Sequence, residues 1–154
     1  YDKNGTHAKN GEVHTPSLEK MLDHSFFRRR HPKSTGKEIF NIKFIPKILL
    51  KKSSNDILAT LTELTSVCIA KSLLSLKKKP DRVIVCGGGQ KNNFLVSSIE
   101  KHIRMPLTSS NKYSFDPQAI EAMAFGWMAR QRVLRNPLLV KKNRGLLGTL
   151  TKFK

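Results

Sequence analysis

The 154-residue sequence contains only two cysteines and one tryptophan, and its 11 acidic residues are far outnumbered by basic ones. Cys68 and Cys86 are too few and too far apart in sequence to build a disulfide framework or a zinc knuckle. The five histidines form no His-Glu-x-x-His pair, the spacing that puts two zinc ligands on one helix face. We therefore expect no metal site made by the ligands of this chain.

Long apolar runs are also missing. The longest apolar stretches are interrupted by Ser, Thr, Glu or Lys before they reach the ~18 residues that a transmembrane helix needs. Residues 1–13 are polar and lack the apolar run of a signal peptide. We expect no membrane span and a cytoplasmic protein. Because the chain opens on Tyr1 rather than Met and enters directly into a turn sequence, we also expect it to be part of a longer protein.

Positive charge is abundant: 29 Lys and Arg against 11 Asp and Glu give a formal net charge of +18. Such an excess is typical of nucleic-acid binding, and a basic nucleic-acid-binding domain is one hypothesis. The basic groups are dispersed over predicted loops and helix ends, however, and no aromatic residues interleave with them as in a stacking platform. This distribution favours a solvated basic surface, or one balanced by an acidic segment elsewhere, over nucleic acid as a partner.

Hydrophobic periodicity predicts an α/β organisation within one domain at most. A strand, a glycine turn, a helix and a second strand form a βαβ pattern, and a further helix that is apolar nearly all round is expected to be enclosed. The predicted elements are a polar loop over 1–14, a helix capped by Thr15, a loop over 26–40, a short helix over 42–50 broken by Pro46, a helix over 55–76, a buried strand over 82–86, a helix over 92–102, a strand over 106–110 and a last helix capped by Asp116.

Three consecutive glycines, Gly87, Gly88 and Gly89, lie between the predicted strand and helix. Without a Cβ atom the backbone can turn tightly and let a ligand approach, and a nucleotide is the natural candidate. A tight turn without a ligand is the open alternative. The motif is no dinucleotide fingerprint, because Asn92 stands where Gly-x-Gly-x-x-Gly requires its last glycine.

Two carboxylates stand alone in apolar helical segments, Glu63 and Glu121. A buried single charge is costly unless it is paired or hydrogen-bonded. Because Thr and Ser residues surround Glu63, we favour a structural partner for it. For Glu121, a structural role and a contact with substrate are equally supported.

Five blocks occur in order along the chain: YDKNGTHA at 1–8, PKSTGKEIF at 32–40, ATLTELT at 59–65, VCGGGQKN at 85–92 and DPQAIEAMAFGW at 116–127. Together they resemble the C-terminal half of the anhydro-N-acetylmuramic acid kinases of bacterial peptidoglycan recycling. The resemblance covers residues 1–135 and leaves 136–154 as a divergent basic tail.

This resemblance implies part of the second domain of an actin-like, sugar-kinase-like ATPase fold. It implies ATP with Mg²⁺, and 1,6-anhydro-N-acetylmuramic acid as the substrate whose anhydro ring is opened while O6 is phosphorylated, giving N-acetylmuramic acid 6-phosphate and ADP. It further implies that Gly87, Gly88, Gly89 and Asn92 hold the nucleotide and that Glu121 contacts the substrate.

Two family motifs have no counterpart in this sequence: the phosphate-binding Gly-Thr-Ser-x-Asp-Gly loop, and the Asp-Thr-Gly-Pro-Gly-Asn block with the aspartate that activates water. We therefore assign no catalytic residue here and expect the chain alone to be an inactive fragment that needs the N-terminal kinase domain as its partner. The resemblance also implies a homodimer. A remnant without function is a further alternative.

Overall fold

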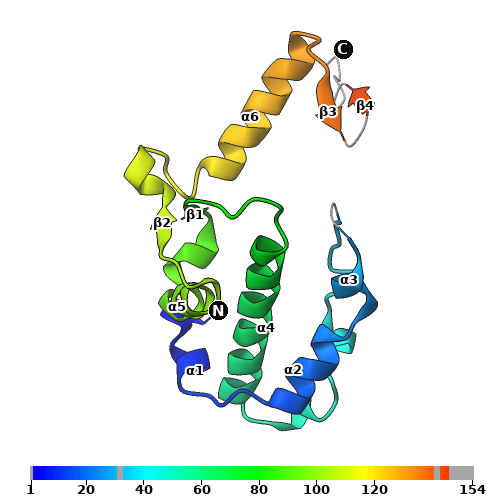
Figure 1. Ribbon diagram of the computed structural model, residues 1–154, viewed down its shortest axis with the longest axis vertical. Helices are drawn as coiled ribbons and strands as arrows, with labels where there is room; N and C mark the ends of the chain where they lie inside the picture. The colour runs from blue at the N-terminus through cyan, green and yellow to red at the C-terminus, as the bar shows by residue number, and fades with distance from the viewer. Residues whose placement is uncertain (1, 31–32, 141–142, 146–154) are drawn as a thin grey trace, which may run out of the picture.

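The computed structural model describes residues 2–30, 33–140 and 143–145, a mixture of helices and short strands (Figure 1). This agrees with the α/β class in its general form. The elements in chain order are η1 (Lys3–Gly5), α1 (Thr6–Lys9), α2 (Thr15–Leu22), α3 (Ser25–Arg28), η2 (Ile42–Phe44), η3 (Leu49–Lys51), α4 (Ser54–Leu74), β1 (Val83–Val85), η4 (Gly88–Lys91), α5 (Asn93–Ile103), β2 (Leu107–Ser109), η5 (Ser110–Tyr113), α6 (Ile120–Val133), β3 (Leu138–Val140) and β4 (Asn143–Gly145).

Helix α4 is the centre of the fold and confirms the helix predicted over 55–76. The Ser53 hydroxyl caps it by accepting the backbone N–H of Asp56 at 3.1 Å. Its sides pack against α1, α2 and α5. One apolar cluster, centred on buried Met21, Leu49 and Leu64, lies between α4 and α2. A second, centred on Ala70, Ile99 and Ile103, joins α4 to α5.

By length and composition alone, α4 could also cross a membrane, a property that the interrupted apolar stretches did not lead us to expect. It is the one helix among the described residues with this property. Core helices of soluble proteins pass the same test. The packing of α4 against three other helices and the polar contacts of Glu63, described below, agree with a core helix.

Strands β1 and β2 pair in parallel through the crossover helix α5, which confirms the predicted βαβ unit. Val83 lies opposite Leu107 and Val85 opposite Ser109, so both strands end at the same edge. The prediction that β1 is a buried strand is wrong, because the sheet has two strands in the described part of the chain and Ile84 is 49% exposed. A central strand needs neighbours on both sides, and β1 has one here.

The N-terminal segment is more ordered than the predicted polar loop. The Asp2 carboxylate accepts the N–H groups of His7 and Ala8, each at 2.9 Å, and thereby supports η1 and α1. Helix α2 is capped one residue earlier than expected, because His14 Nδ1 accepts the Ser17 N–H. The first residues of the predicted loop over 26–40 belong to α3.

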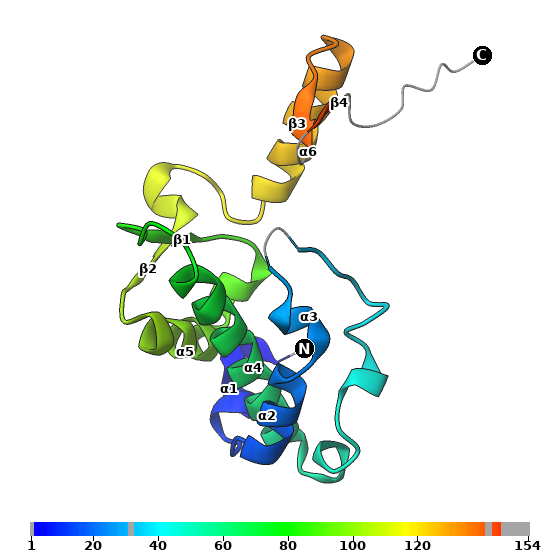
Figure 2. The same ribbon diagram turned by 45° about the vertical axis from the view of Figure 1, so that its right-hand side comes forward.

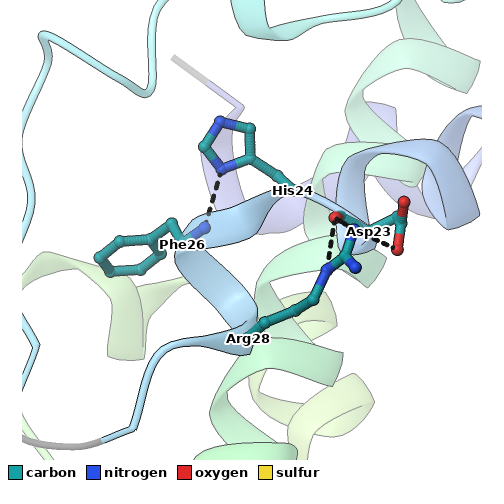
Figure 3. A network of polar contacts seen from close by, with 4 residues as sticks. All are labelled: Asp23, His24, Phe26 and Arg28. Atoms are coloured by element: carbon teal, nitrogen blue, oxygen red, sulfur yellow. Dashed lines mark hydrogen bonds and ion pairs between the residues drawn. The ribbon is translucent and has the colours of Figure 1, made fainter.

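The junction of α2 and α3 is held by local polar contacts (Figure 3). Arg28 forms an ion pair with Asp23 at 2.9 Å and also donates to the Asp23 carbonyl. His24 Nδ1 accepts the Phe26 N–H at 3.2 Å. Because the Arg28 and Asp23 side chains are well exposed, the pair contributes little to stability and mainly fixes the corner.

Helix α6 differs from its prediction at its start and in its surroundings. It begins at Ile120 rather than after Asp116, because residues 116–119 form a turn in which Asp116 Oδ1 accepts the Gln118 N–H at 2.9 Å. The helix is not enclosed: Phe125 is 62% exposed and Trp127 54%. Both views show α6 extending away from α4, α5 and the β1–β2 sheet (Figure 2). No helix or strand in the described residues therefore covers these apolar side chains of α6.

Residues 136–154, predicted to be a divergent basic tail, include two short strands, β3 and β4, which pair in antiparallel orientation. Residues 141–142 and 146–154, which include much of the predicted basic tail, lie outside the described residues.

Replacement of Asp56 by Asn tests the contact between α4 and the segment after α1. The backbone N–H of Glu12 donates a hydrogen bond to the Asp56 carboxylate at 2.9 Å. This hydrogen bond stabilises the charged form and lowers the pKa of Asp56 below 3.8. A lowered folded-state pKa stabilises the fold above the unfolded value, and this contribution is lost as pH falls through the folded value. We therefore expect Asp56→Asn to lose less stability than the wild type between about pH 5 and pH 2, measured by urea unfolding. An equal loss of stability with falling pH in Asp56→Asn and in the wild type would contradict the role of Asp56.

Candidate functional site

The glycine loop, residues 87–89, lies where β1 ends. Gly87 has φ +79°, a left-handed conformation that other residues adopt only with strain. Its N–H donates to the Pro117 carbonyl at 2.9 Å, which fastens the loop to the turn before α6. The carboxyl ends of parallel strands are the usual place for ligands in α/β sheets.

Gly88 and Gly89 need a different explanation. Neither has a positive φ. A Cβ added to Gly88 meets no heavy atom within 4 Å in the described structure, and one added to Gly89 meets only Leu95 Cδ2, at an ordinary 3.8 Å. Neither conformation nor packing among the described residues therefore requires glycine at these positions. Close approach of a ligand to the backbone would account for them, and the nucleotide contact stays a prediction.

Asn92 lies at the far end of this loop and caps α5. Its Oδ1 accepts the Leu95 N–H at 2.9 Å. The same side chain lies against Gly5, where a Cβ would collide with it, and Gly5 has φ +74°. Asn92 thus has a structural task in addition to its predicted contact with a nucleotide.

Gln90 and Ser109 form a contact at the same edge that the sequence did not reveal. The Ser109 hydroxyl, at the end of β2, donates to Gln90 Oε1 at 2.8 Å. Both side chains are half-buried. A polar residue directly after the glycines and another at the end of the next parallel strand is the only sequence signal that points to this pair, and it is a weak one.

Glu63 has the structural partners that we expected for it. Its carboxylate accepts the Ser98 hydroxyl at 3.0 Å and contacts His102 Nε2 at 2.7 Å. Ser98 and His102 lie one turn apart on α5, so the interaction joins α5 to α4. These contacts satisfy the charge within the fold and place Glu63 outside the candidate site.

Glu121 lies in the first turn of α6 and is exposed. Glu121 follows Pro117 by four residues. Because the Pro117 carbonyl accepts a hydrogen bond from the Gly87 N–H, the segment before α6 is held against the glycine loop. The contact of Glu121 with substrate stays a prediction.

At Gly88 the loop has open space over its backbone. No group of three or more His, Cys, Asp or Glu side chains in the described residues could hold a metal ion. Mg²⁺ that accompanies a nucleotide is held mainly by phosphate oxygens and water, with one or two carboxylates.

Comparison with known proteins identifies the family. The family model described as Anhydro-N-acetylmuramic acid kinase matches residues 1–150, which includes most of the predicted tail. An anhydro-N-acetylmuramic acid kinase of Gamma-proteobacterium EBAC31A08 is 41% identical over 100% of this chain and 43% of its own length. Those of Hydrogenovibrio crunogenus and Pasteurella multocida are 35% and 40% identical, over 92% and 86% of this chain and 39% and 37% of their own lengths. The chain spans about two fifths of the curated relatives it matches. These matches confirm the resemblance of the five blocks, and the chain belongs to the anhydro-N-acetylmuramic acid kinase family.

Proposed function

We propose that this chain is the nucleotide-binding C-terminal part of a kinase of peptidoglycan recycling. The reaction consumes ATP, water and 1,6-anhydro-N-acetylmuramic acid. Water opens the anhydro ring, O6 receives the γ-phosphoryl group, and N-acetylmuramic acid 6-phosphate and ADP are released. The observation that carries the proposal is the glycine loop, in which Gly88 and Gly89 are required neither by φ nor by packing.

Each site residue has a defined part in this proposal. The backbone of Gly87, Gly88 and Gly89 lies along the phosphates of the nucleotide, where a side chain would prevent close approach. Asn92 caps α5 and holds the end of the loop. Glu121, exposed at the start of α6, faces the substrate once the kinase is assembled. Mg²⁺ supplies charge neutralisation of the phosphates when it is bound.

The exposed apolar residues of α6, which lie on more than one side of the helix, support the proposal that an N-terminal kinase domain packs against it. Met123, Phe125 and Trp127 are each at least half exposed, which is costly in water. The relatives are more than twice as long as this chain, which agrees with a further domain that covers these side chains. In this arrangement the two parts form the lobes of an actin-like ATPase around a cleft.

A complementation assay tests the function. We expect no ADP release from this chain alone, because the family's phosphate loop and water-activating aspartate are absent from its sequence. Mixing it with the separately expressed N-terminal portion of an intact relative is expected to give ADP release that depends on 1,6-anhydro-N-acetylmuramic acid. The measurement is a coupled ADP assay on the mixture and on each part alone.

Two variants of this chain sharpen the assay. Phe125→Ser removes an aromatic side chain from α6 and is expected to reduce assembly, so that more of this chain is needed for half-maximal turnover. Glu121→Gln is expected to raise the KM for the sugar without changing assembly. No turnover from a mixture in which both parts are folded and associated would refute the proposal.

A further inference from the structure

Gln90 connects the glycine loop with the neighbouring strand. The Ser109 hydroxyl donates a hydrogen bond to Gln90 Oε1 over 2.8 Å. The oxygen of the same hydroxyl accepts the backbone N–H of Asn111 at 3.3 Å. One hydroxyl group therefore links the segment that follows β1 with the segment that follows β2, at the edge where both strands end.

The position of this contact gives the loop a second anchor. The first is the hydrogen bond from the Gly87 N–H to the Pro117 carbonyl. Gly88 and Gly89 lie between the two anchors. Glycine has the largest backbone freedom of all residues, so anchors at both ends add to the backbone hydrogen bonds of η4 in holding Gly88 and Gly89 in one conformation. The half-buried setting of Gln90 and Ser109 protects their hydrogen bond from competition by water.

We propose that Gln90 is a positioning residue for the nucleotide: its hydrogen bond to Ser109 holds Gly88 and Gly89 in the conformation that receives the phosphates. The inference rests on the proposed function and adds a residue that acts through the loop rather than by touching the ligand. Pre-ordering lowers the entropy that binding must otherwise overcome, so the effect is seen in affinity for ligands that carry phosphates.

Titration calorimetry of the full 154-residue chain with ADP tests the proposal. Gln90→Met keeps the length of the side chain but removes the acceptor, and Ser109→Ala removes the donor. Each is expected to weaken ADP binding by about five- to ten-fold. The double variant should be no weaker than the stronger single effect, because both changes break one bond. Ser109→Thr retains the hydroxyl and is expected to bind ADP with the affinity of the wild type. Adenosine, which lacks phosphates, is expected to bind the wild type and all variants equally.

A matched control is Gln118→Met, the same substitution at an exposed residue in the turn before α6, which should bind ADP like the wild type. Unchanged ADP affinity of Gln90→Met, or additive losses in the double variant, would overturn the role of Gln90. If the wild type binds no ADP, the proposed nucleotide-binding function is refuted separately from the proposed role of Gln90. Hydrogen exchange of the Gly88 and Gly89 amides then decides the anchoring: faster exchange in Gln90→Met supports it, and unchanged exchange refutes it.

Discussion

Gly88→Asp is expected to lower the affinity of this chain for ADP by a factor on the order of 100, because a carboxylate would stand where the phosphates approach the backbone. The fold should be unaffected, since a Cβ at Gly88 meets no described atom within 4 Å. Gly88→Ala, which adds only a methyl group, is expected to weaken binding by less. Titration with ADP and a thermal melt of each variant measure the two effects separately.

A control for the charge itself is available on α6. Gly126 also has no described atom within 4 Å of an added Cβ, so Gly126→Asp introduces the same group into equally open space. This variant is expected to bind ADP like the wild type. Equal affinity of Gly88→Asp and Gly126→Asp would show that the glycine loop does not hold the phosphates.

Leu49→Ala is expected to destabilise the fold by about 2–5 kcal/mol, because it removes a fully buried side chain and leaves a cavity. Leu49 has 0% exposure and joins Met21 and Leu64 in the cluster beside α4. A loss of this size is a large part of the stability of a typical domain. Urea unfolding of the purified chain, followed by circular dichroism, gives the change in the free energy of unfolding.

The neighbouring residue provides the control for this cluster. Leu50 is 40% exposed and next to Leu49 in η3, so Leu50→Ala makes the same chemical change on the other side of the turn. We expect it to cost less than about 1 kcal/mol. If the two variants unfold at the same urea concentration, the packing described around Leu49 is not what stabilises this part of the chain.

Local patterns in the sequence predicted α4, α5 and the βαβ unit because the forces that form them act between residues close in the chain. Leucines at helical spacing and the β-branched run after residue 82 are such signals. The glycine loop was also visible, because three glycines between a strand and a helix are rare enough to be informative. The family followed from five blocks in order and was confirmed by the comparisons.

Two helix starts were predicted at the wrong residue, because neighbouring residues compete to satisfy the same backbone donors. His14 caps α2 in place of Thr15, and the turn at residues 116–119 delays the start of α6. The contact between Gln90 and Ser109 joins residues that are 19 positions apart, and no local pattern marks it. Such choices depend on which donor and acceptor the fold brings within reach.

The sequence by itself thus determined the family, the central helices and the position of the glycine loop, because these are written in short-range patterns. The tertiary structure decided three further matters. The Glu63 carboxylate pairs with side chains of α5, an added Cβ at Gly88 or Gly89 would meet no close contact, and the apolar side chains of α6 are exposed. The physical reason is that composition sets how apolar a helix is, whereas burial depends on which other elements are present to pack against it.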